Sequence, residues 1–370
     1  MQGLKKWLLV SLAMQVSGSA VAAPLSPTPD EVRLRPQWQA LDANHDGKVT
    51  LDEVNPILAA SLKKSDLDND GAITLDEYVG FDLDPVGAGR VPLADNVRLL
   101  SDLPYANTND PRQRVDVYLP KRATVAGPLP VIAYVHGGGW SVGSKIMARP
   151  QVMELVNSGR YAAVSIGYRL DWQDKWPAQI YDVKAAIRWI RANAKSYGFD
   201  GKRICAMGDS AGGHLVAQLG VTNGEAPSEG NLGKNLRQTS RVQCVIDMFG
   251  PVDLPNMALK SIVESLLGGT MSAKADVARD ASPISHIDAK DPPFLIIHGT
   301  KDPLVPYQQS VAFEAALSKA GVPVLFQTVE GGGHGQFGAA SPEVARRIRA
   351  FLERNFYDPS TEVPTEVLHK

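Results

Sequence analysis

One serine lies in a setting that could make it a nucleophile. Ser210 is the centre of the run Gly-Asp-Ser-Ala-Gly-Gly-His at 208–214, and the mostly apolar stretch 203–207 before it predicts a buried strand. Apolar residues follow at helical spacing over 215–219. Strand, Gly-x-Ser-x-Gly and helix in this order are typical of a nucleophile elbow, a tight turn that exposes the serine hydroxyl beside a helix N-terminus. Ser210 is therefore the predicted nucleophile.

A serine nucleophile needs a general base, and the base needs a group that orients it. His334 lies in a glycine-rich segment after the predicted strand 324–329, and Asp302 follows the predicted strand 293–298. The chain order Ser, Asp, His, with each residue after a predicted strand, is the order in which α/β-hydrolases carry their triad. We therefore predict His334 as the base and Asp302 as the acid.

Other acidic and imidazole side chains have weaker support. Asp253 also follows a predicted strand and is the main competitor for the acid, but its Gly-Pro-x-Asp context is typical of a structural turn. Asp209 is expected to orient the nucleophile. His214, at the start of the helix after the nucleophile, could line the pocket, whereas His136 and His298 are expected to order loops by hydrogen bonding.

A backbone site for an oxyanion is predicted upstream of the nucleophile. The apolar stretch 129–135 predicts a buried strand that leads into His-Gly-Gly-Gly-Trp at 136–140. Backbone N–H groups in such a glycine run can point toward a developing oxyanion. The predicted donors are the N–H groups of Gly138, Gly139 and Ala211.

Residues 96–358 resemble the α/β-hydrolase superfamily, in the branch that holds hormone-sensitive-lipase-like esterases and secreted bacterial carbohydrate esterases. The runs 136–140 and 208–213 are shared by both groups. Four segments are more similar to the acetylxylan- and feruloyl-esterase-like group: 176–182, 250–253, 298–302 and 305–306. The resemblance implies an α/β fold, a mostly parallel sheet with helices on both faces, and a serine carboxylic ester hydrolase acting on short-acyl or acylated-carbohydrate esters.

The resemblance leaves the substrate open. A peptidase or amidase, or a lipase, on the same fold is an alternative, and a calcium-dependent binding protein with an inert hydrolase domain is a non-enzymatic one. The complete Ser, Asp, His set argues against the last. The stretch 254–268 is the expected cap, and it carries Lys260 and Glu264, so short acyl chains are favoured. No metal or organic cofactor is expected in the chemistry.

Two twelve-residue segments match the EF-hand calcium loop, with oxygen ligands at positions 1, 3, 5 and 12 and glycine at position 6. The predicted ligands are Asp42, Asn44, Asp46, Lys48, Thr50 and Glu53 in the first loop, and Asp66, Asp68, Asp70, Ala72, Thr74 and Glu77 in the second, with Lys48 and Ala72 offering backbone carbonyls. Val49 and Ile73 are expected to pair across a short ribbon. Only residues 54–65 separate the loops, so one helix from Val54 to Lys64 must serve both, or the pairing is unusual.

The remaining segments complete the predicted organisation. Residues 1–22 have the charged start, short apolar run and Ala-x-Ala end of a secretory signal. The predicted order is signal 1–22, linker 23–37, small helical EF-hand-like calcium pair 38–83, linker 84–95, hydrolase 96–358 and a mobile polar tail 359–370. The chain is thus expected to be exported to the bacterial periplasm or the extracellular space. Ca²⁺ is expected to order residues 38–83 and to stay outside the chemistry.

Charge and cysteine content restrict the partners further. The net charge of −2 implies no nucleic-acid or membrane partner, and the expected partner is a small-molecule or carbohydrate ester. The sequence does not indicate an oligomeric state. Cys205 and Cys244 are the two cysteines. Export permits a disulfide, but adjacent parallel strands rarely offer the required geometry, so free buried thiols are favoured.

Overall fold

The computed structural model describes residues 38–39, 41–54, 63, 66, 68–83, 88–224, 228–335, 337 and 341–370. The predicted secretory signal and most of the helix expected between the calcium loops lie outside these residues. Within the described part of the chain, no helix has the length and the apolar character that crossing a membrane requires.

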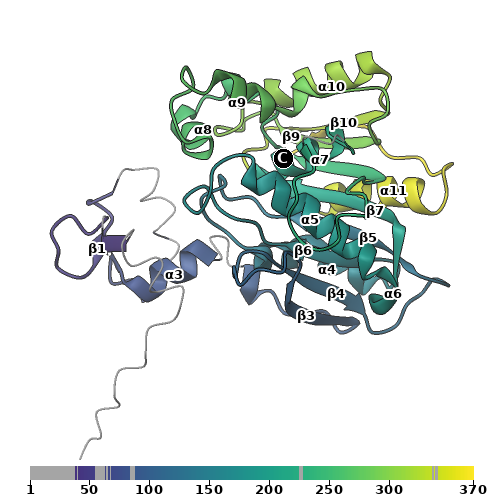
Figure 1. Ribbon diagram of the computed structural model, residues 1–370, viewed down its shortest axis with the longest axis horizontal. Coiled ribbons are helices and arrows are strands. Elements are labelled where there is room, and N and C mark those ends of the chain that lie inside the picture. The colour runs from purple at the N-terminus through teal and green to yellow at the C-terminus, as the bar shows by residue number, and fades with distance from the viewer. Residues whose placement is uncertain are drawn as a thin grey trace, which may run out of the picture.

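A nine-stranded sheet forms the centre of the main body (Figure 1). Its strands are β3 (Val97–Pro104), β4 (Arg114–Pro120), β5 (Leu129–Val135), β6 (Ala162–Ile166), β7 (Phe199–Asp209), β8 (Cys244–Met248), β9 (Phe294–Gly299), β10 (Val324–Glu330) and β11 (Leu368–His369). The spatial order is β11-β10-β9-β8-β7-β5-β6-β4-β3. All neighbours are parallel except β3–β4 and β4–β6, which confirms the expected mostly parallel sheet.

Both faces of the sheet are buried, as β5 shows. Val131, Ala133 and Val135 pack into one hydrophobic cluster, and Ile132 and Tyr134 pack into a second. Successive strand residues point to opposite faces, so a strand that is apolar throughout needs cover on both. The described helices of the main body are α4 (Arg149–Asn157), α5 (Ala178–Ala192), α6 (Ala194–Tyr197), α7 (Ala211–Val221), α8 (Lys260–Leu267), α9 (Ala275–Asp280), α10 (Gln308–Ala320) and α11 (Pro342–Phe356). Residues of α5, α7 and α10 join the first cluster, and residues of α4 and α11 join the second.

Short 3₁₀ turns complete the main body: η1 (Ala88–Arg90), η2 (Lys145–Ala148), η4 (Leu254–Asn256) and η5 (Pro283–Ser285). The segments predicted to carry the chemistry follow β5, β7, β9 and β10. Because parallel strands end at the same edge of a sheet, these four segments meet there, where ligands of open α/β sheets usually bind.

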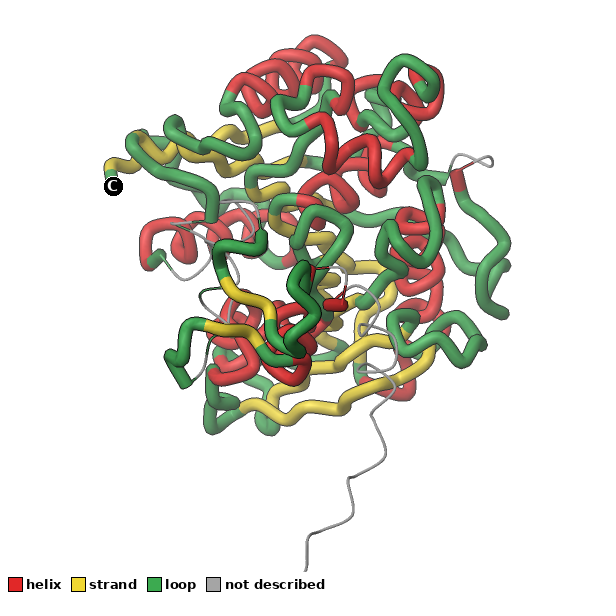
Figure 2. Tube along the Cα trace, turned by 90° about the vertical axis from the view of Figure 1, so that its left-hand side faces the viewer, coloured by secondary structure: helices red, strands yellow, loops and turns green. Residues whose placement is uncertain are grey.

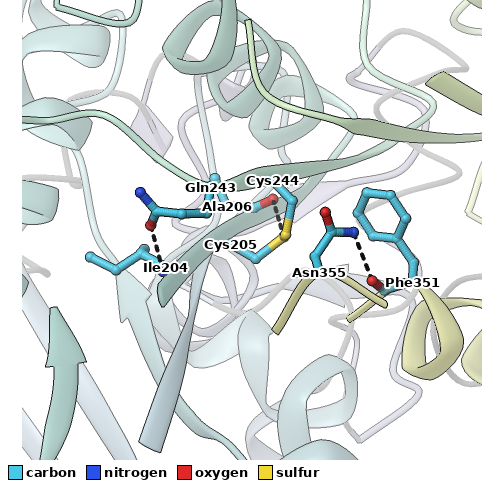
Figure 3. The surroundings of a disulfide bond; sticks show 7 residues. All are labelled: Ile204, Cys205, Ala206, Gln243, Cys244, Phe351 and Asn355. Atoms are coloured by element: carbon cyan, nitrogen blue, oxygen red, sulfur yellow. Dashed lines mark hydrogen bonds between the residues drawn. A yellow bond between two sulfur atoms is a disulfide. The ribbon is translucent and has the colours of Figure 1, made fainter. Parts of the chain in front are cut away.

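The expectation of free cysteines is wrong, since Cys205 and Cys244 form a disulfide (Figure 3). The two residues are direct partners in the register of β7 and β8, with a Cα–Cα distance of 4.6 Å. In-register neighbours point to the same face of the sheet, and this Cα separation lies inside the range that a disulfide spans. Phe351 and Asn355 of α11 lie beside the bridge (Figure 3).

The expectation of a mobile C-terminal tail is also wrong at its end. Strand β11 pairs in parallel with β10, where Leu368 aligns with Val329. The backbone N–H of Lys370 donates to the carbonyl of Glu330 at 3.0 Å. Backbone pairing of this kind depends on an open sheet edge rather than on apolar periodicity, which is why the polar tail gives no sign of it in the sequence.

The N-terminal module contains a two-stranded ribbon, β1 (Val49–Thr50) and β2 (Ala72–Ile73), followed by helix α3 (Leu75–Leu83). The predicted pairing of Val49 with Ile73 is confirmed. Trp38 joins these two residues in a small hydrophobic cluster, and Val142 of the main body packs against that cluster. Figure 2 views the molecule from the side on which the module lies.

Candidate active site

Ser210 lies at the tight turn between β7 and α7, with φ 52° and ψ −120°. Its N–H donates to the carbonyl of Met248 at 2.9 Å, which ties the turn to β8. The glycines of the motif are required by close approach. A Cβ on Gly212 would lie 2.1 Å from the carbonyl oxygen of Val135, and one on Gly208 would lie 2.5 Å from that of Gly212. The strand, turn and helix predicted around Ser210 are therefore present.

The structure brings the three predicted triad residues together. His334 Nε2 lies 2.9 Å from Ser210 Oγ, and His334 Nδ1 lies 2.7 Å from Asp302 Oδ2. An ionised carboxylate can only accept, so the imidazole donates from Nδ1 and its Nε2 accepts from the serine hydroxyl. This tautomer is the one in which the imidazole can take the serine proton.

The carboxylate of Asp302 is fully buried and has several donors. Its Oδ1 accepts from the N–H groups of Leu304 at 2.8 Å and Val305 at 3.0 Å. Burial raises the pKa of Asp302, but hydrogen bonds from His298 and His334 outweigh that effect and hold the pKa below its usual range. Asp302 is therefore a stable anion beside His334 at neutral pH.

His298 orders its loop by hydrogen bonding, as expected, but its contact with the predicted acid was not foreseen from the sequence. Its Nε2 lies 3.2 Å from Asp302 Oδ2 and 3.0 Å from the carbonyl of Val305, and its Nδ1 lies 2.7 Å from Ser310 Oγ. These partners are satisfied when Nε2–H donates and Nδ1 accepts from the serine hydroxyl. The available signal was the spacing of four residues between His298 and Asp302 across the end of β9.

The competing carboxylates have other partners. Asp253 accepts from Asn256 Nδ2 at 2.7 Å, and its backbone bonds to the side chain of Gln309. Asp209 accepts from the hydroxyl of Tyr134, and burial raises its pKa. Asp302 is thus the carboxylate that the fold brings to His334.

The oxyanion segment, defined here as residues 136–143, follows β5. Gly138, Gly139 and Trp140 have φ values of 110°, 58° and 59°. The segment closes on itself through the N–H groups of Ser141 and Val142, which donate to the carbonyl of Gly138 at 3.0 and 3.1 Å. Strands β5 and β7 are direct neighbours, so this segment lies beside the nucleophile turn.

The predicted donor on the far side of Ser210 is the N–H of Ala211, the first residue of α7. The first N–H groups of a helix have no acceptor within it, and the helix dipole adds partial positive charge at that end. The segments carrying Gly138, Gly139 and Ala211 therefore lie at adjacent strand ends, as an oxyanion site requires.

His214 does not line an open pocket, because its side chain is fully buried. Its Nδ1 accepts from Trp140 Nε1 at 3.2 Å, and its Nε2 donates to the carbonyl of Ala281 at 2.7 Å. Burial lowers its pKa to about 4. His136 is buried as well and stacks on Tyr168 with ring centroids 4.3 Å apart. These histidines order the loops of the site, as predicted for His136.

Phe249 is a residue that sequence reasoning missed. It follows β8 with a φ of 47°, and its ring meets that of His334 edge to face with centroids 4.8 Å apart. A second edge contact joins it to Phe337 at 5.5 Å. A bulky residue at positive φ is strained and needs support from its surroundings. No pattern in the sequence points to this packing role.

The two predicted calcium loops have the same internal bonding. Asp42 accepts from the N–H groups of Asp46 and Gly47 at 3.1 and 3.0 Å. Asp66 accepts from the N–H groups of Asp70 and Gly71, each at 3.1 Å. The glycines have φ values of 87° and 85°, which glycine adopts without strain. Both loops therefore make the sharp turn expected at position 6.

The acidic side chains of the second loop converge. Asp66, Asp68 and Asp70 each offer a carboxylate oxygen, and these atoms lie within 4.8 Å of one another. At position 12, Glu53 accepts from Thr50 N–H at 2.7 Å and Glu77 accepts from Thr74 N–H at 2.9 Å. This oxygen-rich donor set fits a hard divalent cation such as Ca²⁺.

One side chain links the two loops. Lys48, whose carbonyl was predicted as a ligand of the first loop, places its Nζ 2.9 Å from Asp70 Oδ2 of the second. Glu53 also accepts from the N–H of Asn44 at 3.0 Å, which closes the first loop. The loops thus form one unit around the β1–β2 ribbon.

Comparison with known proteins gives consistent matches. Residues 115–317 match the BD-FAE family, and residues 39–55 and 58–81 match the EF hand. Esterase LipC of Mycobacterium tuberculosis is 32% identical over 66% of this chain. Esterase LipQ of the same organism is 32% identical over 67% of it. The match spans 63% and 59% of the length of these two relatives.

Similar solved structures are also esterases or ester hydrolases. A truncated carbohydrate esterase from gut microbiota is 34% identical, with a TM-score of 0.67 over 72% of this chain and 99% of its own. An acetyl ester-xyloside bifunctional hydrolase from Caldicellulosiruptor lactoaceticus is 26% identical, with a TM-score of 0.58 over 68% of this chain and 93% of its own. The main body therefore has the α/β-hydrolase fold, and the segment before it in the chain matches the EF hand.

Proposed function

The chain belongs to the BD-FAE family of α/β-hydrolase esterase domains, and on this premise we propose that it hydrolyses carboxylic esters with Ser210, His334 and Asp302 as its triad. The observation that carries the proposal is the continuous pair of hydrogen bonds, 2.9 Å from Ser210 to His334 and 2.7 Å from His334 to Asp302. This pair is the arrangement that activates a serine hydroxyl at neutral pH.

The reaction proceeds through an acyl-enzyme. His334 takes the hydroxyl proton as Ser210 Oγ attacks the ester carbonyl, and Asp302 stabilises the imidazolium that forms. The N–H groups of Gly138, Gly139 and Ala211 bind the oxyanion of the tetrahedral intermediate. His334 then protonates the departing alcohol. In the second half, His334 accepts a proton from water, which attacks the acyl group. The bond between the acyl group and Ser210 Oγ then breaks, the acid leaves, and His334 returns the proton to Ser210 Oγ.

We further propose that the substrates are short-acyl esters, including those of acylated carbohydrates. The likenesses to a carbohydrate esterase and to an acetyl ester-xyloside hydrolase support this class. The cover near the oxyanion segment also supports it, since the predicted cap contains only η4 and the eight-residue helix α8. A cover this short offers little apolar surface for a long acyl chain.

The N-terminal loops are proposed to hold structural Ca²⁺ through Asp42, Asn44, Asp46 and Glu53, and through Asp66, Asp68, Asp70 and Glu77, with carbonyls of Lys48 and Ala72 and water-mediated contacts near Thr50 and Thr74. When bound, the ion supplies positive charge that offsets carboxylate repulsion. None of these ligands belongs to the proposed triad. The predicted signal at residues 1–22 supports an exported location.

A substrate panel tests the proposed function. The panel contains p-nitrophenyl acetate, butyrate and palmitate, methyl ferulate, acetylated xylo-oligosaccharide and a peptide p-nitroanilide, each with Ser210→Ala protein as the blank. Hydrolysis of the short esters by wild-type protein and not by the variant is expected. Turnover of the anilide alone would favour a peptidase or amidase, and no turnover of any substrate would favour an inert domain.

A further inference from the structure

The oxyanion segment has a backbone conformation that needs external support. Three consecutive residues, Gly138, Gly139 and Trp140, are at positive φ. Glycine adopts such a conformation freely, but for tryptophan it is strained. A strained segment keeps its shape only where neighbouring groups hold it. The hydrogen-bond partners of Trp140 and Ser141 therefore decide whether the oxyanion donors stay in place.

Asp171 provides that support from the loop after β6. Its backbone N–H donates to the carbonyl of Trp140 at 2.9 Å, and its Oδ2 accepts from Ser141 Oγ at 2.8 Å. The next residue, Trp172, donates from Nε1 to the carbonyl of Ser141 at 3.1 Å. Asp171 is buried, with 2% of its surface exposed. A bond from a hydroxyl to a buried carboxylate is stronger than one between neutral groups.

The same carboxylate oxygen also binds the cap. Ser265 Oγ on α8 donates to Asp171 Oδ2, so one oxygen accepts from two hydroxyls on different elements. A backbone bond strengthens this attachment, since the N–H of Trp176 donates to the carbonyl of Leu266 at 3.0 Å. The loop after β6 thus holds the oxyanion segment on one side and α8 on the other.

Helix α8 carries an exposed apolar side chain toward the oxyanion segment. Ile262 lies one turn before Ser265, and residues three apart share a helix face. Its Cγ2 lies 3.5 Å from the position that a Cβ on Gly139 would occupy. Ile262 is 38% exposed, whereas Val263 beside it is fully buried. The isoleucine is therefore an open apolar surface next to a proposed oxyanion donor.

We propose that Asp171 is a positioning residue that fixes α8 to the oxyanion segment. Ile262 is then the apolar side chain that limits the length of the acyl group bound there. This inference rests on the proposed ester hydrolysis. It assigns the acyl-chain specificity of that reaction to one bridge, which consists of Asp171 and the two serines that donate to it, Ser141 and Ser265. The hydrogen bond from Ser141 links Asp171 to the oxyanion segment, and the hydrogen bond from Ser265 links it to α8, which carries Ile262.

Two matched substitutions separate the branches of the bridge. Ser141→Ala and Ser265→Ala each delete one hydroxyl that donates to the same oxygen. Ser141→Ala should lower kcat roughly tenfold for both acetyl and hexanoyl p-nitrophenyl esters, because oxyanion donors act on the transition state. Ser265→Ala should act on KM and change the ratio of kcat/KM for acetyl over hexanoyl ester roughly fivefold in favour of hexanoyl. Ile262→Ala should shift that ratio in the same direction.

Asp171 itself supplies the test of the bridge. Asp171→Ala should combine the kcat loss of one serine variant with the ratio change of the other. Asp171→Asn keeps an acceptor oxygen, so both its kcat and its acetyl-to-hexanoyl ratio should be close to those of the wild type. Ser318→Ala is the control, because this exposed serine donates its hydroxyl to Glu314 on the same helix, α10, away from the site.

The outcomes distinguish this inference from the proposed function. Absence of ester hydrolysis by wild-type protein would overturn both. Normal hydrolysis by wild-type protein, with both serine variants giving the same kcat and the same ester ratio as Ser318→Ala, would overturn the bridge alone. If Asp171→Ala does not fold, as judged by loss of cooperative melting, the two serine variants still decide the question.

Discussion

His298 Nε2 lies 3.2 Å from Asp302 Oδ2, so the carboxylate that contacts His334 also has a second histidine as a hydrogen-bond donor. Both imidazoles meet the same oxygen, because His334 Nδ1 lies 2.7 Å from it. His298 contacts no reacting atom and acts through Asp302. It is therefore a positioning residue, and its effect should be visible in the pH dependence of kcat/KM.

His298→Ala is expected to lower kcat roughly 10- to 100-fold, since one hydrogen bond to a charged group contributes about 1.5–3 kcal/mol. Loss of this donor leaves more of the carboxylate charge of Asp302 facing His334, so the acid limb of the kcat/KM profile, which reports protonation of the general base, should move to higher pH. The profile is measured from about pH 4 to pH 9. His298→Gln keeps a donor and should recover part of the loss, and His286→Ala, at a half-buried histidine outside the proposed triad, is the control. An unchanged acid limb with reduced kcat would assign His298 a purely structural role.

Ser210→Ala should reduce ester-hydrolysis kcat by roughly 10⁵–10⁶, because removal of a triad member leaves only binding and oxyanion stabilisation. His334→Ala should cost a similar factor, and the double variant little more, since the pair acts as a unit. Steady-state and single-turnover kinetics on p-nitrophenyl acetate provide the measurement. Retention of even about a tenth of wild-type turnover by Ser210→Ala would contradict the assigned nucleophile.

Acetyl to butyryl esters should be preferred over chains longer than about ten carbons. Each buried methylene gains about 0.8 kcal/mol only where apolar pocket surface receives it. Helix α8 provides that cover and is eight residues long. Ile262 is its large apolar side chain that is exposed. The check is kcat/KM across a p-nitrophenyl series from two to sixteen carbons. A steady increase to palmitate would contradict the prediction and favour a lipase.

Calcium removal should loosen the module and leave the chemistry largely intact. At calcium about one hundred times Kd, binding stabilises a folded region by about 2.7 kcal/mol. Chelator should therefore increase proteolysis near residues 38–83 and lower the melting temperature of that region. Glu53→Gln combined with Glu77→Gln should have the same effect in the presence of calcium.

The contact between Val142 and the module's hydrophobic cluster makes the activity measurement informative. The N–H of Val142 donates to the carbonyl of Gly138, but Asp171 holds the same segment from the other side through Ser141. We expect chelator to change kcat on a small ester less than about threefold. A loss greater than about tenfold would show that the module controls the oxyanion segment, and the proposed separation of the two roles would be wrong.

Asp247 should make stability depend on pH. Burial raises its pKa to about 7, and its Oδ2 has no hydrogen-bond partner among the described residues. An acid whose folded pKa exceeds its unfolded value contributes stability that is complete below the unfolded pKa, about 3.9, and is lost as the pH rises through about 7. The expected loss is on the order of 4 kcal/mol.

Urea unfolding at about pH 4.5, 6 and 8 measures this dependence, with Asp247→Asn as the matched variant. The difference in free energy of unfolding between wild type and variant should shrink or reverse as the pH rises. A difference that stays constant between pH 4.5 and pH 8 would show that Asp247 ionises at its ordinary pKa.

Much of the proposed catalytic arrangement is visible in the sequence, because it depends on local order. A strand, a glycine turn and a helix follow one another around Ser210, and Asp302 and His334 each follow a strand. Such segments are recognisable from apolar runs and turn residues alone. The paired EF-hand-like loops and the Val49–Ile73 ribbon were predictable for the same reason, since each loop is a continuous stretch of chain.

Only the tertiary structure decided between Asp253 and Asp302. Both follow strands, but β9 is the direct neighbour of β10 and β8 is not, so Asp302 reaches His334. The register of β7 and β8 likewise aligned Cys205 with Cys244. Chain order does not determine spatial strand order, because connections can skip a neighbour. The partners across strand ends, and the bridge at Asp171 with them, therefore depend on how the sheet assembles.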